Sequence, residues 1–505
     1  MERLIIAITL FLGLATAPGS GLAQEAGSIA GRVVDAETQA PLSEVTVLIE
    51  GEDLGSLTKS DGAFVISNVP PGSYVLVFRI LGYGTVTRPD VIVAPGRSTQ
   101  IDAQLRVAAV ELGGIVVDAG FFPRSPSQPA SAFELNAEEV RREPGSAGDI
   151  SRVLLALPST AQISDQGNDL FVRGGAPFEN GFFIDGIQVG NINHFPVQGS
   201  TGGPIGMVHL EWVDDVRFSA GGFSAAYGDR LSSIVDIDFR DGSPEETQVG
   251  AEMSMMDLGG SAEGPLGDQG SWLFSARKSY MDFIVDAVGT GVAPGFEDAQ
   301  GKVSYDLDPS NRISGLALVG QSRIGFTRDE AIDDGNLAFG DYTSRQGTIG
   351  VSWRRLWGSR GYSVVALSAS EETAQDDWFR TASTDSLAQS DYTERAFRFR
   401  NTNRIRLGSS VSLEMGADAE VNRNRYDYVL GAHHDRLGNP VPRFQVNTDH
   451  DEERAGAFGT VSWAITPAWD FTAGGRVDHY TASEETRFYP RFSSSFAVTE
   501  RLTLN

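Results

Sequence analysis

The chain has 505 residues, a formal net charge of −27 and no cysteine. Its length allows two or three domains with a large core. The negative charge argues against nucleic acid as a partner, because phosphate binding needs a basic surface. Without cysteine, the chain can form neither disulfides nor thiolate metal sites.

The first 23 residues have the pattern of a secretory signal peptide. Arg3 provides a short charged region, Leu4 to Ala17 an apolar run, and Gly21-Leu22-Ala23 a small-x-small cleavage site. A membrane anchor is the weaker interpretation, because the run is short and interrupted by a glycine and a threonine. No later stretch is long and apolar enough for a spanning helix, so we expect any membrane crossing to be made by a β-barrel.

Residues 27–106 consist of short segments rich in Val and Ile, separated by turn residues such as Asp61-Gly62 and Pro70-Pro71-Gly72. This pattern predicts a small β-sandwich. The stretches GRVVDAETQAPLSEVTVLIEG and TKSDGAFVISNVPPGSYVLVFRILGY resemble the carboxypeptidase regulatory-like domain. The resemblance implies a fold and not a peptidase activity, and the segment contains no histidine.

The second region, about 107–243, mixes helix and strand signals. Asp149 can cap a helix over ISRVLLAL, which Pro158 ends. The runs FFI and IQV flank Asp185-Gly186, the pattern of a two-residue hairpin turn. We expect a bend at Gly221-Gly222 and a strand over IVDIDF (234–239).

From about Gln248 onward, segments such as GTIGVSWRRLW and SVSLEMGADAEV alternate apolar and polar residues, and their connections are of two alternating kinds. The short connections are 265–270, 308–311, 358–361, 408–410, 466–468 and 499–501, and the long polar ones include 323–345, 371–391 and 425–451. This sorting is typical of an outer-membrane β-barrel, whose strands need roughly 9–11 residues each.

The short turns predict about twelve strands, of which the last starts at Leu502, while the sequence stops at Asn505. A barrel with an open edge would leave backbone groups unpaired in lipid, so we expect a fragment of a longer chain. Tryptophans near strand ends are expected at the two membrane interfaces. They are Trp272, Trp353, Trp357, Trp463 and Trp469.

The sequence does not indicate a catalytic, cofactor or metal site. The nearest Walker-like stretch, GFEDAQGKV at 295–303, has one residue too many and Val at the hydroxyl position. The one cluster of histidines, His433-His434-Asp435, falls in a predicted long loop, and we favour a solvated loop over a metal site. We therefore expect no enzymatic activity and no cofactor.

Two stretches of the second region occur in the order found in plug domains of TonB-dependent outer-membrane receptors, and they resemble the motifs of those plugs. They are DLFVRGGAPFENGFFIDGIQVGNINHF and VRFSAGGFSAAYGDRLSSIVDIDFRDG. The following GSAEGPLGDQGSWLFSARKSYMDFIV resembles the first barrel hairpin of that family. The plug-motif residues are Arg173, Gly174, Gly175, Glu179, Asp185, Gly186 and Asn191, and the plug-to-barrel motif has Gly221, Gly222, Tyr227, Gly228 and Arg230.

These features predict a mainly β fold with a small N-terminal β-sandwich, an α+β plug and part of a C-terminal antiparallel transmembrane β-barrel. The expected segments are a signal peptide (1–23), the sandwich (27–106), a linker (107–119), the plug (120–243) and the N-terminal part of the barrel (244–505). Arg173, Glu179, Asp185 and Asn191 are expected to offer polar groups to the lumen.

The resemblance implies that the plug blocks the barrel until an inner-membrane partner, TonB, pulls on an extended segment by adding a strand to it. The segment Ile115-Val116-Val117-Asp118-Ala119 resembles a TonB box. An ordinary linker or edge strand is the competing interpretation. The proline-rich FFPRSPSQPA that follows would keep the segment extended.

The implied function is energy-coupled uptake of a scarce nutrient through the outer membrane, with a siderophore, cobalamin, a saccharide or a peptide as cargo. Outer-membrane lipid surrounds such a barrel, and a surface lipoprotein is a further candidate partner. A surface receptor that binds a ligand and signals without transport is one alternative. A soluble multidomain β-adhesin is another.

Overall fold

The computed structural model describes residues 26–107, 132–146, 148–162, 167–200, 203–254, 256–281, 294–333, 335–408, 410–434, 439–466, 468–499 and 502–504. The expected signal peptide, the candidate TonB box and Asp435 lie outside these residues. Within the described part of the chain, no helix combines the length and apolar character needed to cross a bilayer.

The N-terminal unit is a sandwich of two β-sheets, as predicted. One sheet has the order β4 (Ala63–Val69), β1 (Gly27–Asp35) and β7 (Ser98–Gln100), with β8 (Ala103–Leu105) also on β1. The other has the order β3 (Gly55–Leu57), β2 (Thr46–Ile49), β5 (Gly72–Arg79) and β6 (Val86–Val93). Alternate apolar residues of both sheets, among them Ile29, Val47 and Phe78, form one buried core.

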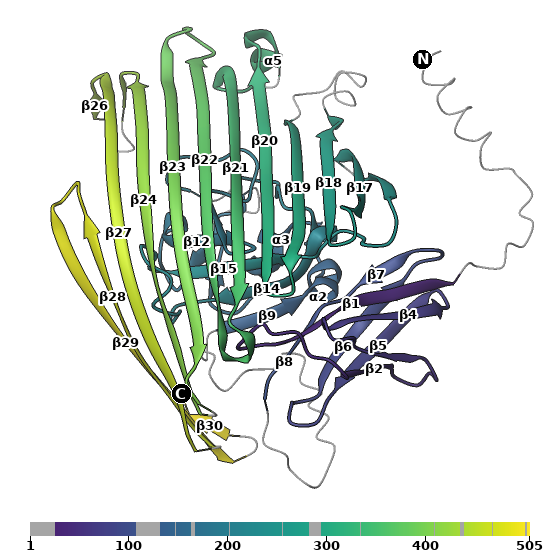
Figure 1. Ribbon diagram of the computed structural model, residues 1–505. Coiled ribbons are helices and arrows are strands. Elements are labelled where there is room, and N and C mark those ends of the chain that lie inside the picture. Colours follow the sequence, from purple (N-terminus) through teal and green to yellow (C-terminus); the bar gives the residue numbers. More distant parts are fainter. Residues whose placement is uncertain are drawn as a thin grey trace, which may run out of the picture.

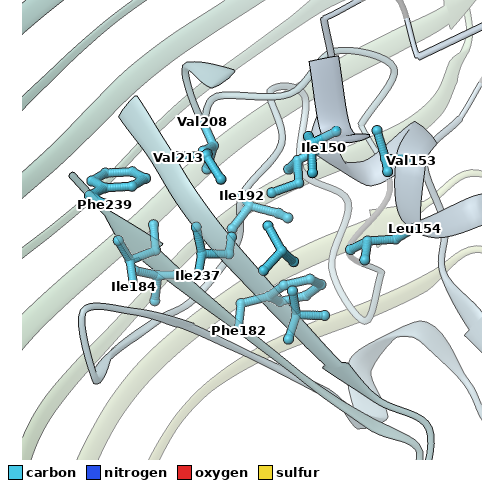
Figure 2. Packing of buried hydrophobic residues seen from close by; sticks show 14 of the residues in the cluster. Ile150, Val153, Leu154, Phe182, Ile184, Ile192, Val208, Val213, Ile237 and Phe239 are labelled. Atoms are coloured by element: carbon cyan, nitrogen blue, oxygen red, sulfur yellow. The ribbon is translucent and has the colours of Figure 1, made fainter. Parts of the chain in front are cut away.

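The second unit, called the plug below, has a five-stranded mixed sheet. Its order is β13 (Ile187–Val189), β12 (Asn180–Ile184), β15 (Ser233–Phe239), β14 (Val213–Ser219) and β9 (Ala132–Asn136). The smaller elements are α2 (Ala137–Arg142), α3 (Ile150–Leu155), η1 (Pro177–Glu179), η2 (Leu210–Trp212), β10 (Thr160–Ala161) and β11 (Phe171–Val172). Helix α3 packs on the sheet and encloses an apolar core with it (Figure 2).

Local chemistry of the plug follows the sequence predictions. The Asp149 side chain accepts a hydrogen bond from the backbone N–H of Ser151 at 2.8 Å and so caps α3. Strands β12 and β13 pair around Asp185-Gly186, whose φ angles of +50° and +76° are those of a type I′ turn. Gly221 and Gly222 both have positive φ, at the expected bend.

The third unit is a continuous antiparallel sheet of thirteen strands in chain order within the described residues, called the barrel wall (Figure 1). Its strands are β16 (Gln248–Met253), β17 (Asp257–Pro265), β18 (Gly270–Ser279), β19 (Gly295–Asp308), β20 (Asn311–Phe326), β21 (Ala338–Leu356), β22 (Gly361–Arg380), β23 (Ser386–Arg406), β24 (Val411–Leu430), β27 (Phe444–Thr466), β28 (Trp469–Tyr480), β29 (Glu485–Thr499) and β30 (Leu502–Leu504). The wall curves around the plug, and the sandwich lies below it (Figure 1).

The six predicted short connections all join consecutive wall strands at one edge of the wall, which we call the turn rim. The opposite edge, the loop rim, carries α5 (Arg328–Asp333) and the small hairpin of β25 (His433–His434) with β26 (Pro440–Val441). The thirteenth strand is β16. It was missed because it precedes the first short turn and joins β17 through residues 254–256 alone.

Strands β17 and β18 have 9 and 10 residues, as predicted, but the longer wall strands exceed the prediction and the predicted long loops are shorter than expected. Strands β21 to β24 and β27 have 19 to 23 residues, and the expected loop 371–391 shrinks to residues 381–385. Strand pairing depends on backbone hydrogen bonds and continues where the side chains become polar. Cross-strand ion pairs such as Arg395 with Glu371 (2.5 Å) accompany it there.

The tryptophans also depart from the prediction. Trp272, Trp353, Trp357, Trp463 and Trp469 all lie within a few residues of a short connection, and therefore near the turn rim. Trp378, near the loop rim, packs instead with a cluster of aromatic residues on the inner face. The described wall therefore has its outward tryptophans at one edge, not two.

Candidate functional site

The interface between the plug and the inner face of the wall contains Asp185 of the first motif and the loop of the second motif. At its turn-rim side, the hairpin residue Asp185 pairs through Oδ2 with Lys302 Nζ of β19 at 3.0 Å. Lys302 also donates to the Phe239 carbonyl at 2.5 Å. Asp241 binds two strands, accepting from Ser304 Oγ of β19 at 2.7 Å and pairing with Arg312 of β20.

The other polar residues of the first plug motif stabilise the plug itself. Glu179 accepts a hydrogen bond from Ser232 Oγ at 2.6 Å, and a Cβ on Gly175 would lie 1.7 Å from that oxygen. Asn191 is buried and accepts from the Asn193 backbone N–H at 3.0 Å. Arg173 is exposed. Among the described interactions, Asp185 alone of the four expected lumen-facing residues reaches the wall.

The second motif, residues 221–228, forms a loop whose carbonyl oxygens are bound by three arginines of the wall. Arg491 of β29 donates to the carbonyls of Phe223 (2.5 Å), Ser224 and Tyr227 (3.0 Å). Arg476 of β28 donates to the carbonyl of residue 225 at 3.5 Å, and Arg400 of β23 to that of residue 226 at 3.4 Å. Successive carbonyls therefore attach this loop to three strands.

Side chains of the same loop add to the attachment. Ser224 Oγ donates to Glu414 Oε2 of β24 at 2.7 Å. The Arg400 guanidinium lies 4.6 Å from the Tyr227 ring centroid, a cation–π geometry. Gly228 is required by space, because a Cβ there would lie 2.2 Å from Arg476 Nε. Arg230, at the end of the motif, pairs with the adjacent Asp229 at 3.3 Å.

The arginines belong to a buried ion network on the inner face of the wall. Arg476 has no solvent exposure and pairs with Asp418 (2.7 Å) and Asp478 (2.6 Å). Arg454 pairs with Asp418 (2.7 Å), Asp478 (3.2 Å) and Glu420 (3.2 Å). Each buried charge is thus compensated by an opposite charge, as burial requires.

Midway up the wall, two plug histidines bind one wall carboxylate. His194 Nε2 lies 2.8 Å from Asp298 Oδ2, and His209 Nε2 lies 2.6 Å from Asp298 Oδ1. Arg277 of β18 donates to Asp298 Oδ2 at 2.9 Å and to the Gly206 carbonyl at 2.8 Å. Burial lowers the pKa of both histidines, so each is a neutral imidazole that donates from Nε2 to the carboxylate.

Sequence reasoning missed this histidine–carboxylate cluster. The two histidines are separated by a loop, and their acceptor is about a hundred positions further along the chain. No spacing rule joins such residues, and the only signal in the sequence is His194 near the end of the first plug motif.

Toward the loop rim, the plug loop after His194 meets a group of inward aromatic residues, which we call the aromatic cluster. Its members are Phe195, Ile205, Phe296, Tyr342, Tyr392, Trp378, Tyr426 and Tyr428, and Ala374, Met256 and Ile324 pack against them. Tyr342 donates its hydroxyl to the Pro196 carbonyl. Tyr392 donates to Glu372 and Tyr426 to Glu394, both at 2.8 Å. Val197, at the plug apex, is 58% exposed, so this end of the plug offers an accessible surface.

The histidine cluster lies at the loop rim, away from the plug. His433 and His434 form β25 in the small hairpin at the loop rim, and His433 Nδ1 lies 3.0 Å from the Gly431 carbonyl. In the described ranges, no group of three or more His, Cys, Asp or Glu residues is arranged to hold a metal ion.

Two protein-family models and one curated protein match parts of this chain. A carboxypeptidase regulatory-like domain model matches residues 28–106, and a model of the TonB dependent receptor-like β-barrel matches residues 277–505. Among curated proteins, the TonB-dependent transporter Oar of Myxococcus xanthus is 24% identical over 237 residues, which make up 45% of this chain and 22% of Oar.

Three solved structures illustrate the similarity of fold. A mutant of the ferric enterobactin receptor PfeA of Pseudomonas aeruginosa has a TM-score of 0.57 at 16% identity, over 74% of this chain and 61% of that one. The siderophore receptor PirA of Acinetobacter baumannii gives 0.54 at 14%, over 74% and 60%. The copper transporter OprC gives 0.53 at 16%, over 74% and 61%. The chain thus spans less than two thirds of the length of each.

Proposed function

Because this chain belongs to the TonB-dependent receptors, we propose that the full-length protein is an outer-membrane receptor that takes up a scarce small nutrient with energy supplied through TonB. It is a receptor and not an enzyme. The observation that supports this most directly is the plug on the inner face of the wall, held by Lys302, Asp298 and the arginines that bind residues 221–228. A plug attached in this way obstructs a barrel until work is done on it.

In the proposed orientation, the turn rim faces the periplasm and the loop rim faces the outside, as in other outer-membrane barrels. The sandwich lies beside the turn rim (Figure 1), where an exported N-terminal domain would be periplasmic. Residues 115–119 would then be within reach of an inner-membrane partner, which would bind them by strand addition.

The ligand would bind at the aromatic cluster and the exposed plug apex around Val197. Phe195 belongs to this cluster, and its neighbour His194 binds Asp298. A ligand that shifts Phe195 would therefore act on the plug–wall attachment and change the population of the attached plug. Similar structures include siderophore receptors and a copper transporter, so ferric siderophores and copper are the first cargo to test, followed by cobalamin, saccharides and peptides.

The test is an in-frame deletion of residues 115–119 in the full-length gene, with a deletion of residues 124–128 as a control of equal length in the proline-rich segment. Uptake of labelled ferric siderophores, copper, cobalamin, oligosaccharides and peptides is measured in the parent bacterium. We expect the 115–119 deletion and a null mutant to lose the same cargo, and the control deletion to retain it.

Two outcomes would contradict the proposal. Uptake at the wild-type level after deletion of 115–119 would exclude transport driven through this segment. A mature protein that fractionates as soluble, with no heat-modifiable migration in gels, would exclude the membrane barrel.

A further inference from the structure

The sandwich is bound to the turn rim of the wall by a buried charge pair. Arg406, the last residue of β23, pairs through Nη2 with both oxygens of Asp35, at 2.8 and 3.0 Å. Its Nε donates to Glu37 Oε2 at 2.8 Å. The Asp35 side chain is 3% exposed, so water competes poorly for this contact. One arginine of the wall thus connects to two acids, Asp35 at the end of β1 and Glu37 in the turn after it.

Two more wall strands contact the same edge of the sandwich. Arg32 Nη2 on β1 lies 3.0 Å from Asp306 Oδ2 of β19. Arg354 Nη1 of β21 donates to Gln39 Oε1, in the turn after β1, at 3.3 Å. Because β19, β21 and β23 all end at the turn rim, a single edge of the sandwich spans this part of the rim.

The sandwich holds Asp35 ready for its arginine. The Asp35 carboxylate accepts hydrogen bonds from the backbone N–H groups of Glu37 and Thr38 and from the Tyr83 hydroxyl, each at 2.9 Å. These donors fix the carboxylate within its own domain, so little side-chain freedom is lost when Arg406 binds. A carboxylate held in place in this way favours binding of the arginine, because it is already oriented before the two domains meet.

The docked sandwich also faces the plug. Arg88 of β6 interacts electrostatically with Asp214 and Asp215 of the plug strand β14. The plug has its own attachment to the wall through Lys302, Asp298 and the loop 221–228, so the sandwich is not needed to hold it.

We propose that the edge of the sandwich formed by β1 and residues 35–39 is a docking surface for the turn rim of the chain's own barrel, latched by Arg406, and that the docked sandwich shields the underside of the plug from a periplasmic partner. The shielding part rests on the proposed function, whereas the docking part does not. The contacts are polar and part-exposed at their margins, so the latch can open and be solvated without unfolding either domain.

The docking is tested by crosslinking in outer-membrane vesicles that contain the full-length receptor. The 505 residues contain no cysteine, and any cysteine further along the full-length chain is first changed to serine, so that the pair Gln39→Cys with Arg354→Cys gives a clean site for a short bismaleimide. The pair Leu57→Cys with Arg354→Cys is the control for random collision, because Leu57 lies in the other sheet and is exposed. We expect efficient crosslinking of the first pair and little of the second.

The contribution of Arg406 to docking is tested by adding Arg406→Ala to the pair Gln39→Cys with Arg354→Cys, called the reporter pair below. We expect the crosslinking yield to fall about fivefold, the loss that corresponds to one kcal/mol of a part-buried ion pair. Arg395→Ala, which removes an exposed arginine from the outer face of the same strand, is the matched control and should leave the yield unchanged. Glu37→Arg places a like charge against Arg406 and should lower the yield if Arg406→Ala does not assemble. A yield that neither substitution changes overturns the latch.

The shielding is tested with the purified periplasmic domain of TonB as the probe. We expect this domain to lower the crosslinking yield of the reporter pair in the chain that keeps Arg406. We also expect it to bind the Arg406→Ala receptor more tightly than the Arg395→Ala receptor. Binding that leaves the yield and the affinities unchanged overturns the shielding. If the TonB domain does not bind at all, the proposed function and the shielding both fail, while the crosslinking result still decides the docking.

Discussion

The plug and the barrel wall use the same alternation of apolar and polar residues with opposite polarity. In the plug sheet, alternate residues such as Val216 and Ile237 point into a core and are fully buried. In the wall, apolar residues point outward, with Ile349 64% and Phe397 51% exposed, while Arg476 and Asp478 on the inner face are fully buried. The difference shows that strand periodicity fixes which residues share a face, and the surroundings decide which face is apolar.

Because the polar faces of the plug and of the wall meet, the contacts between the two units are largely polar. The mainly polar exterior of the plug meets a mainly polar inner face of the wall, so many of their contacts are ion pairs and hydrogen bonds to carbonyls. Apolar contacts occur where Leu273, Leu316 and Leu318 of the wall join the plug core and at the aromatic cluster near the loop rim. Water can replace such contacts when the units separate, which it cannot do for an apolar core. A largely polar interface therefore agrees with the proposed function, in which the plug separates from the wall and returns.

The largest expected effect comes from breaking the buried network of the wall. Arg476→Ala would leave Asp418 and Asp478 without one of their two arginines and remove one of the contacts to the loop 221–228. We expect a loss of about 3–5 kcal/mol, because an uncompensated charge would stay buried. The measurement is urea unfolding of the reconstituted full-length receptor, followed by tryptophan fluorescence.

Arg395→Ala is the matched control for this effect. Arg395 pairs with Glu371 on the outer face, and both side chains are more than half exposed. Removing it should cost less than about 1 kcal/mol, since water already screens the pair. Equal losses of stability in the two variants would mean that the inner face of the wall is as well hydrated as its rim, contrary to the burial of Arg476 and Asp478.

A smaller effect is expected on the outer face. Ile349→Arg places a charge on the exposed apolar side of β21 and should cost about 2–4 kcal/mol if lipid surrounds the middle of that strand. Gln375→Arg, on the same face of β22 but nearer the loop rim, should cost about 0–1 kcal/mol. Equal losses at the two depths would argue against a membrane around the wall.

What the sequence predicted well is local in the chain. The turn at Asp185-Gly186, the cap at Asp149 and the six short connections each depend on residues a few positions apart, and the structure has all of them. Alternation over whole segments also predicted the antiparallel wall. The extent of the long strands escaped because their polar upper parts look like loops, while backbone pairing continues through them.

What the sequence did not predict depends on pairs distant in the chain. His194 meets Asp298, Arg491 meets Phe223, and Arg406 meets Asp35 across 371 positions. No motif marks the arginines of the wall as partners of plug carbonyls, because any inward arginine at that height has the same pattern. Glu179 and Asn191 were assigned to the lumen because polar motif residues looked free, whereas turns inside the plug use them.

The smallest expected effect on stability comes from Asp214, an acid of the plug sheet. Asp214 of β14 is half-buried, and burial raises its pKa to about 6, with Asp102 and Asp238 adding to the shift and Arg88 and Lys302 opposing it. The folded chain thus holds this proton more tightly than the unfolded chain, whose carboxyl has a pKa of 3.8. Stability from this group is present below pH 4 and lost as the pH rises to 6.

Asp214→Asn removes this titration and should stabilise the receptor at pH 7 by about 1 kcal/mol, the shift being discounted for partial exposure. The wild type and the variant should converge as the pH falls from 6 to 4, which urea midpoints across that range would measure. In the wall, Asp478 is compensated by two arginines, and its loss should destabilise. If Asp214→Asn also destabilised the receptor at pH 7, Arg88 would be neutralising Asp214 as fully as the wall arginines neutralise theirs, and the two units would not differ in how they treat a buried acid.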